Sequence, residues 1–239
     1  TRILQDGKRI TGIEDTSKNT FYSDVVLANS DAQYTKDKLL SAKPEETKPE
    51  VSSSAIVFYW GVKGNYAGLE IHNILFSENY KKEFIEIFDE RKIPSDPTVY
   101  IYISSKFNKD DAPGGNENWF VMINAPYNEG ENWTKKIPAV RKSVIQKIKD
   151  FLKIDLTGKI IEEEILTPKI LETKTNSYKG SIYGISSNSR KAAFIRQRNK
   201  SNKVNGLYFC GGSAHPGGGI PLVLQSGKIT ADLVRKYEL

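Results

Sequence analysis

The 239-residue sequence has a single cysteine, Cys210, and a single methionine, Met122. One cysteine excludes an internal disulfide and leaves no second thiolate for a metal site, which is typical of a protein from a reducing compartment. The histidines and carboxylates show no spacing of metal ligands, so we expect no bound metal. The chain begins at Thr1 rather than at a methionine, and we therefore expect a fragment or a processed form.

Long apolar stretches are also missing. No run approaches the roughly 20 apolar residues that a membrane-spanning helix needs, and no charged-then-apolar leader opens the chain. The 35 Lys and Arg residues exceed the 29 Asp and Glu residues only slightly, for a net charge of +6. Most of these cations suit solvated helix faces, and residues 190–200 alone concentrate them beside apolar side chains. We expect a cytoplasmic protein that does not bind nucleic acid.

Two common phosphate-binding motifs are absent as well. The dinucleotide fingerprint G-x-G-x-x-G does not occur, so the segment that usually clamps the adenosine and diphosphate of a dinucleotide is missing. Residues 226–230 do not form a P-loop, because Ile229 stands where serine or threonine is required and Leu222 where the first glycine should be.

The residue patterns along the chain predict both strands and helices. The sequence contains no internal repeat. Residues 3–13 predict a hairpin around Asp6 and Gly7, and residues 21–28 predict one buried strand. Four runs rich in β-branched and aromatic residues predict a mostly antiparallel sheet, over residues 53–62, 69–76, 98–103 and 119–124. Apolar positions three and four apart predict helices over residues 79–87 and 137–152.

The segment that carries chemistry is a predicted strand, loop and helix over residues 206–230. The loop has five glycines, which let backbone amides approach a ligand closely. The helix start offers unpaired N–H groups and a partial positive charge, and Pro221 suits its first turn. This layout indicates an anion-binding site, and the alternative is a tight turn in which the glycines only fold a connection.

The motif HPGGGIP at residues 215–221, followed by Ser226 and Gly227, closely resembles the C-terminal signature of the bacterial phytoene desaturase family, within the flavin amine oxidase-like group. Looser similarity over residues 25–31, 56–62, 118–127 and 167–168 extends the resemblance over nearly the whole chain. It implies an α+β or α/β fold that forms the C-terminal part of a two-domain flavoprotein. A mixed antiparallel substrate-domain sheet with helices would accompany the last strand, loop and helix of a Rossmann-like FAD-binding domain.

The resemblance and the polar, proline-bearing stretch at residues 43–50 divide the chain into three segments. Residues 1–42 would be a returning segment of the FAD-binding domain. Residues 43–190 would be the substrate-binding domain, and residues 191–239 the C-terminal FAD-binding segment. The N-terminal dinucleotide-binding portion would be missing, so we expect the isolated chain to be inactive and to hold FAD weakly.

FAD is the cofactor that the resemblance implies. Backbone amides of the loop and helix start would face its pyrophosphate, its ribityl chain or a flavin carbonyl, with His215 and Pro216 on the ring side and Asn29 at the returning strand. The residues expected to bind FAD are Gly211, Gly212, His215, Pro216, Gly218, Gly219, Ile220, Pro221, Leu222 and Asn29. The alternatives are a shaping role for His215 and a turn cap for Asn29 and Asp31.

The implied function is removal of hydride from a long polyene such as phytoene, which needs little acid–base machinery and leaves the catalytic residues unassigned. Aromatic residues of the strand runs would wall an apolar tunnel or form ordinary core, and His72 would be a packed or surface residue. The hydrophobic polyene implies peripheral contact with the inner face of the membrane. The alternatives are a retinoid or carotenoid saturase or isomerase, a flavin amine oxidase, and a non-enzymatic module that binds a hydrophobic ligand.

Overall fold

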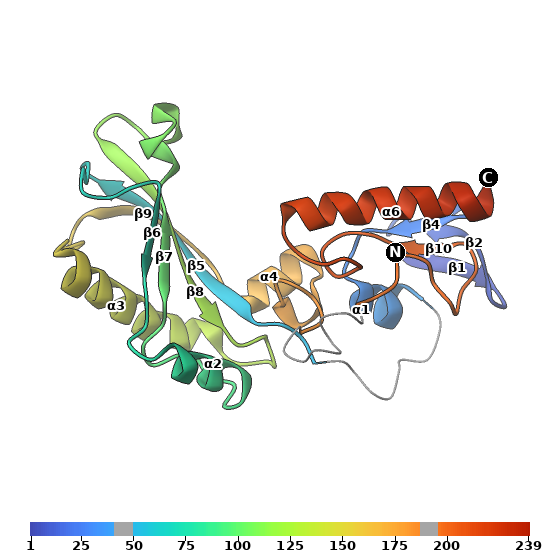
Figure 1. Ribbon diagram of the computed structural model, residues 1–239, viewed down its shortest axis with the longest axis horizontal. Coiled ribbons are helices and arrows are strands. Elements are labelled where there is room, and N and C mark those ends of the chain that lie inside the picture. Colours follow the sequence, from blue (N-terminus) through green and yellow to red (C-terminus); the bar gives the residue numbers. More distant parts are fainter. Residues whose placement is uncertain (41–49, 187–195) are drawn as a thin grey trace. The chain divides into compact units, whose positions relative to one another are not determined.

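The protein is represented by a computed structural model, drawn as a ribbon in Figure 1. The structure describes residues 1–40, 50–186 and 196–239. Helices combine with antiparallel sheets, so the predicted α+β class is confirmed. Within the described residues, no helix is both long enough and apolar enough to cross a membrane.

The chain divides into two compact units. Unit 1 contains residues 1–52 and 172–239, and unit 2 contains residues 53–171. The domain boundaries expected from the sequence, at 42/43 and 190/191, lie outside the described residues. The first and last segments of the chain therefore form one unit, and the middle of the chain forms the other.

Unit 2 is built on a five-stranded antiparallel sheet in the order β6-β7-β8-β5-β9. The strands are β5 (Ser54–Lys63), β6 (His72–Leu75), β7 (Val99–Tyr102), β8 (Asn116–Ala125) and β9 (Ile160–Leu166). The first four correspond to the four predicted runs, and β6 is shorter than its run. The sequence did not predict β9, because three glutamates interrupt its apolar residues.

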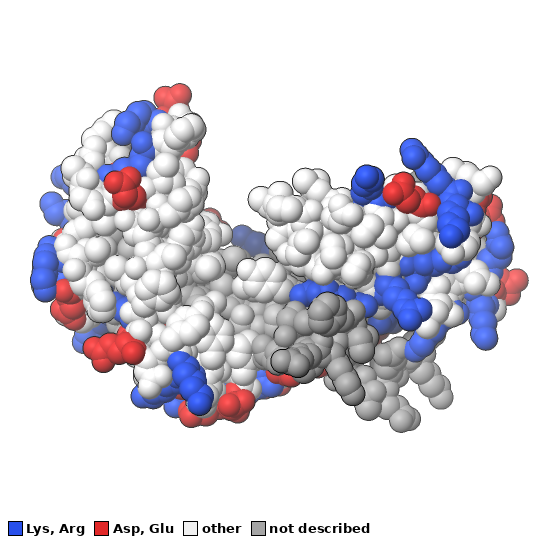
Figure 2. Space-filling model, in the orientation of Figure 1, with Lys and Arg blue, Asp and Glu red and all other residues white. Residues whose placement is uncertain are grey.

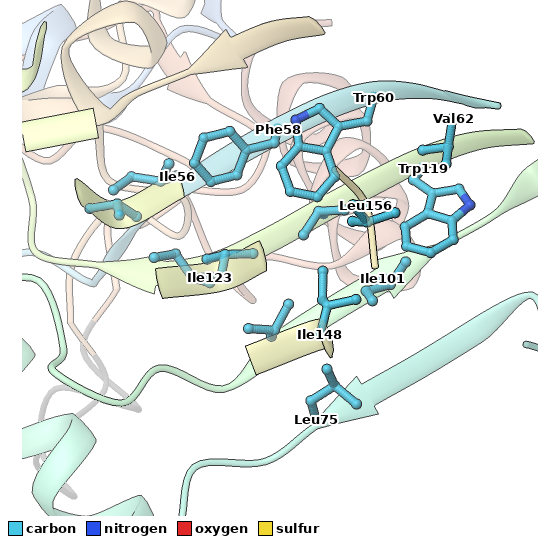
Figure 3. Close-up of a cluster of buried hydrophobic side chains, with 14 of the residues drawn as sticks. Ile56, Phe58, Trp60, Val62, Leu75, Ile101, Trp119, Ile123, Ile148 and Leu156 are labelled. Carbon is cyan, nitrogen blue, oxygen red and sulfur yellow. The ribbon is translucent and has the colours of Figure 1, made fainter. Parts of the chain in front are cut away.

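One face of this sheet packs against the helix α3 (Trp133–Leu152). Figure 3 shows Phe58, Trp60 and Ile101 of the sheet in the same cluster as Ile148 of α3. Burial of each large apolar side chain contributes about 1.5–3 kcal/mol to folding. Along β8 every second residue is buried, and Trp119, Val121, Ile123 and Ala125 belong to this cluster, as the alternation of the sequence requires.

The helix α3 begins earlier than its apolar periodicity predicts. The side chain of Asn132 caps it by accepting a hydrogen bond from Lys135 N at 3.1 Å, so the helix starts at Trp133. It ends where Lys153 adopts a left-handed conformation at φ 59°. The other α-helices of the described residues are α1 (Ala32–Tyr34), α2 (Tyr80–Phe88), α4 (Pro168–Thr175) and α6 (Ile220–Glu238).

Shorter helical turns complete the secondary structure. A π-helical turn follows α1 at Thr35–Leu39, and 3-10 turns occur at Ser104–Lys106, Lys109–Asp111 and Tyr178–Gly180. The sequence interpretation placed residues 178–186 in a loop, and the structure shows a short 3-10 turn at its beginning.

Unit 1 carries two small sheets. Three antiparallel strands form the first, β1 (Arg2–Asp6), β2 (Arg9–Glu14) and β3 (Thr20–Tyr22), and two parallel strands form the second, β4 (Val26–Ala28) and β10 (Leu207–Phe209). The predicted single strand over residues 21–28 is therefore wrong. Ser23 Oγ donates to Val25 O at 2.7 Å and accepts from Val25 N at 3.2 Å, and this turn separates β3 from β4.

We expect Phe58→Ala to lower the free energy of unfolding of unit 2 by about 3–5 kcal/mol, because it leaves a cavity at a fully buried position. Tyr59→Ala is the matched control, since the neighbouring side chain is 43% exposed, and it should cost about 1 kcal/mol. Urea denaturation followed by tryptophan fluorescence measures both losses, because all three tryptophans lie in unit 2. Equal losses of unfolding free energy in the two variants would contradict the assignment of Phe58 to the core face and Tyr59 to the opposite face of the sheet.

Candidate functional site

The glycine-rich loop, residues 210–219, connects the end of β10 to the start of α6 in unit 1. Strand β10 runs parallel to β4, and Cys210 N donates to Ala28 O at 3.0 Å directly after the paired residues. The ends of two parallel strands lie at the same edge of a sheet. The structure therefore brings the loop beside Asn29, the residue that follows β4.

Gly211 is the loop residue that contacts Asn29 most closely. Its φ is +98°, and a Cβ atom at this position would lie 2.5 Å from Asn29 Oδ1, so only glycine fits here. The Sγ atom of Cys210 lies 3.7 Å from the same oxygen, and burial raises the pKa of the Cys210 thiol. Asn29 and Gly211, both predicted as site residues, are thus neighbours.

The helix α6 begins without a capping side chain. Gly219 is its N-cap at φ 93°, and the space where a Cβ atom would stand is open. Pro221 has no N–H, so Ile220 and Leu222 supply the N–H groups of the first turn, which have no partner inside a helix. Ile220 is 80% exposed and Leu222 is 44% exposed. An accessible, uncapped helix start is a suitable place for an anion or another electron-rich oxygen.

Charge is distributed unevenly along α6. Figure 2 shows an uncharged surface over the start of the helix, where Leu224 is also exposed, and mostly cationic side chains farther along it. Arg235 and Lys236 lie in the last turn, where cations interact favourably with the helix dipole. The predicted site residues Gly219, Ile220, Pro221 and Leu222 therefore lie together at the uncharged end.

Tyr183 and Arg196 hold the loop from one side. A Cβ atom on Gly218 would lie 2.5 Å from the Tyr183 ring, and one on Gly217 would lie 2.8 Å from Arg196 Nε. Arg196 donates to Tyr183 O at 2.9 Å and to Gly212 O at 3.3 Å, and burial lowers the pKa of its guanidinium. Sequence reasoning missed both residues, because nothing local to them marks a contact with the loop.

A buried polar cluster fixes α6 to the end of β10. Ser226 and Thr230, one turn apart on α6, are both fully buried. Thr230 Oγ1 donates to Phe209 O at 2.9 Å or to Ser226 O at the same distance. Gly211 N donates to Ser226 Oγ at 3.2 Å, so the first glycine of the loop is bound to the helix that follows it.

Asn199 is the centre of this cluster and is 4% exposed. Its Nδ2 atom lies 2.9 Å from His215 O, 3.1 Å from Ser226 Oγ and 3.2 Å from Thr230 Oγ1. The same atom lies 3.2 Å from Phe209 O. One amide group thus connects the strand, the loop and the helix. Sequence reasoning missed Asn199, since an isolated asparagine between basic residues carries no signal of burial.

Asp31 has a structural role at the start of α1. Its carboxylate accepts hydrogen bonds from Gln33 N at 2.9 Å and Tyr34 N at 3.0 Å, and burial raises the pKa of this carboxyl. Ala32 N donates to Ser213 Oγ of the glycine-rich loop at 2.9 Å. For Asp31, the alternative expectation of a cap is therefore what the structure shows.

His215 lies in a different environment from the start of α6. It is exposed, it precedes a cis peptide bond to Pro216, and His215 N donates to Gln197 O at 2.8 Å. It lines a pocket of about 480 Å³ together with Arg196, Arg198, Asn199, Lys200, Ser201, Asn202, Leu233 and Tyr237. Leu233 and Tyr237 belong to the second half of α6, and Arg196, Arg198 and Lys200 make this pocket basic, so the structure places His215 among cations.

Unit 2 offers a second candidate surface, the face of the five-stranded sheet that points away from α3. The strand register aligns His72, Tyr102, Phe120, Tyr59 and Glu164 in one row across the five strands. The rings of Tyr59 and Phe120 meet edge to face at 5.5 Å, and those of His72 and Tyr102 are stacked at 5.2 Å. We call this surface the aromatic face.

The predicted aromatic runs divide between the two faces of the sheet. Phe58, Trp60 and Trp119 are at most 2% exposed and belong to the core against α3. Tyr59, Tyr100, Tyr102 and Phe120 lie on the aromatic face. The expectation of ordinary core is thus confirmed for Phe58, Trp60 and Trp119, and a wall beside a ligand stays a prediction for the residues of the aromatic face.

We expect Asn199→Ala to loosen α6, because it leaves buried acceptors on Phe209, Ser226 and Thr230 without this donor. The loss should be about 2–3 kcal/mol. Hydrogen exchange of the α6 amides should accelerate accordingly, by about 30-fold or more. The matched control is Asn202→Ala, an exposed asparagine three residues further along the chain, which should leave the exchange unchanged. Equal exchange in the two variants would contradict the role of Asn199.

Comparison with known proteins relates this chain to carotenoid enzymes. No protein-family model matches it. A 1-hydroxycarotenoid 3,4-desaturase of Flavobacterium sp. is 49% identical over 98% of this chain and 48% of the relative. A 4,4'-diaponeurosporene oxygenase of Staphylococcus haemolyticus is 33% identical over 96% of this chain and 47% of the relative. A phytoene desaturase of Phycomyces blakesleeanus is 31% identical over 95% of this chain and 41% of the relative.

Among solved structures, an oxidoreductase from Methanosarcina mazei has the same fold, with a TM-score of 0.56 at 15% identity over 98% of this chain and 48% of that chain. The chain spans about half the length of the curated relatives that it matches. The resemblance predicted from the glycine-rich motif is confirmed: along nearly its whole length, this chain is a homologue of the carotenoid desaturases.

Proposed function

We propose that this chain is the C-terminal portion of an FAD-dependent enzyme that removes hydride from a long polyene of the carotenoid class. The observation that carries the proposal is the 49% identity, over 98% of the chain, with a protein named as a 1-hydroxycarotenoid 3,4-desaturase. The same name supports a carotenoid with a hydroxyl group near its end as the substrate. A carotenoid oxygenase is the second candidate, because a relative with that name is 33% identical.

The start of α6 suits FAD. Its accessible N–H groups and the open space at Gly219 fit an oxygen-rich ligand such as the diphosphate, the ribityl chain or a flavin carbonyl. FAD, when bound, would supply the hydride acceptor for the oxidation. The residues that we assign to this contact are Asn29, Gly211, Gly212, Gly218, Gly219, Ile220, Pro221 and Leu222. His215 and Pro216 would shape the loop, since His215 lies in the basic pocket.

The aromatic face suits the polyene. A conjugated chain is flat and apolar, and aromatic rings bind such chains by their faces and edges. Tyr59, Tyr102 and Phe120 present a continuous row of rings, and Tyr59 is 43% exposed. Because a carotenoid partitions into the bilayer, peripheral contact with a membrane is part of the same proposal.

A flavin absorbance spectrum of the full-length protein, purified in detergent, tests the function. We expect the bands of oxidised flavin, and we expect anaerobic addition of a carotenoid substrate to bleach them, because hydride transfer reduces the flavin. A saturated hydrocarbon of the same length is the control and should leave the spectrum unchanged. A bound flavin that stays oxidised with carotenoids would contradict the substrate class, and a protein that takes up no flavin would contradict the cofactor.

Ile220→Asp tests the position of the cofactor. A carboxylate in the first turn of α6 should stabilise the helix by about 0.3–1 kcal/mol through its dipole. It should nevertheless weaken FAD binding by about tenfold or more, because it repels the proposed ligand oxygens. The asparagine side chain has about the same size as aspartate but no charge, so Ile220→Asn is the matched control. Titration of the apoprotein with FAD measures both affinities, and equal affinities would contradict the contact at α6.

A further inference from the structure

A polar pair lies at one end of the aromatic face. His72 on β6 and Tyr100 on β7 place His72 Nδ1 2.8 Å from Tyr100 Oη. The two rings are nearly parallel, at 16° and 6.1 Å between centroids, and the ring of His72 is also stacked on Tyr102. Strand β6 is the first strand of the sheet order, so the pair marks one edge of the surface.

The surroundings of this pair are apolar. Tyr100 is paired across the strands with Ile74 and Met122, and its ring lies 6.2 Å from that of Phe120. Ile74 is 51% exposed. From the pair, the row of rings continues through Tyr102 and Phe120 to Tyr59. Four strands at ordinary spacing make this row roughly 14 Å wide, the length of a conjugated segment with several double bonds.

The chemistry of the pair matches an alcohol. When the Tyr100 hydroxyl donates to His72 Nδ1, the proton of the neutral imidazole is on Nε2, which leaves an N–H to donate. The phenol oxygen of Tyr100 retains a lone pair that can accept. The Nε2–H and the Tyr100 oxygen lie on different sides of the imidazole, so an alcohol at this place accepts one hydrogen bond from His72 Nε2–H, and the Tyr100 hydroxyl fixes the tautomer that supplies it. Burial raises the pKa of Tyr100, which keeps the phenol protonated.

We propose that His72, held in this tautomer by Tyr100, donates a hydrogen bond to the terminal hydroxyl group of a hydroxylated polyene whose conjugated chain lies along the aromatic face. The inference rests on the proposed function, since it assumes a carotenoid substrate, and it identifies the residues that select among carotenoids. A hydrocarbon end at this place would cover the His72 Nε2–H without offering it an acceptor, and a polar group that loses water and gains no partner weakens binding. The pair is thus a specificity determinant and has no part in hydride transfer.

The test compares two polyenes of equal length, a 1-hydroxycarotenoid and the same carotenoid without the hydroxyl group. Equilibrium binding of each to the full-length protein in detergent is followed by quenching of tryptophan fluorescence. Wild-type protein should bind the hydroxylated polyene about tenfold more tightly, the value of one good hydrogen bond. His72→Phe, which keeps a stacked ring, should bring this ratio close to one. Tyr100→Phe, which removes only the hydroxyl group that fixes the His72 tautomer, should lower the ratio.

Tyr102→Phe is the matched control. Tyr102 lies on the same strand and the same face, and among the described residues its hydroxyl group has no hydrogen-bond partner, so the ratio should stay near tenfold. Thermal denaturation of all variants checks that the fold is kept. Equal binding of both polyenes to the wild-type protein, or an unchanged ratio in Tyr100→Phe, would overturn this inference and leave the proposed function standing. Binding of neither polyene would overturn both.

Discussion

The side-chain amide of Asn199 is the interaction on which the candidate site of unit 1 depends. Buried donors and acceptors that lose their partners cost about 1–3 kcal/mol each, so the surrounding groups can adopt few other arrangements. The cluster requires Ser226 and Thr230 to face the end of β10. Once these two residues are fixed, the direction of α6 is fixed, and with it the place of its uncapped first turn.

The same cluster explains why the loop needs its glycines at particular positions. Gly211 must turn directly after β10, because its N–H is already bound to Ser226 and its Cα lies against Asn29. Gly218 must admit the ring of Tyr183. Gly219 has no such neighbour, and its φ of 93° leads into the helix while its open side remains accessible. Gly211 and Gly218 are therefore required by close packing, whereas Gly219 leaves the start of α6 accessible to a ligand.

Local patterns in the sequence predicted much of this structure. The alternation in β8 and the three-and-four spacing in α3 each follow from one buried face, which is a property of the element itself. The strand, loop and helix at residues 206–230 could be predicted for the same reason, since glycine and Pro221 act locally. The family was then inferred from similarity to a known motif, because residue spacing alone does not identify a family.

The features that the sequence did not reveal depend on contacts between distant segments. Strand β9 contains Glu163 on its core side, and the charge is tolerated there because Trp60 Nε1 donates to it at 2.5 Å and Arg141 Nε at 2.7 Å. The division of residues 21–28 arises because β3 pairs with β2, whereas β4 pairs with β10 near the other end of the chain. Asn199 is buried only because α6 and β10 both pack on it.

The two units present different chemistry. Unit 1 presents backbone N–H groups and a basic pocket, and unit 2 presents rings and aliphatic side chains. Relatives named as desaturases and as an oxygenase match 95–98% of this same chain, so proteins named for different reactions share this framework. A loop held by a buried hydrogen-bond network tolerates little variation, whereas half-exposed side chains on a sheet can change at small cost to stability. In the proposed function, the aromatic face is therefore the part of this chain where substrate selectivity can change without disturbing the proposed cofactor contact.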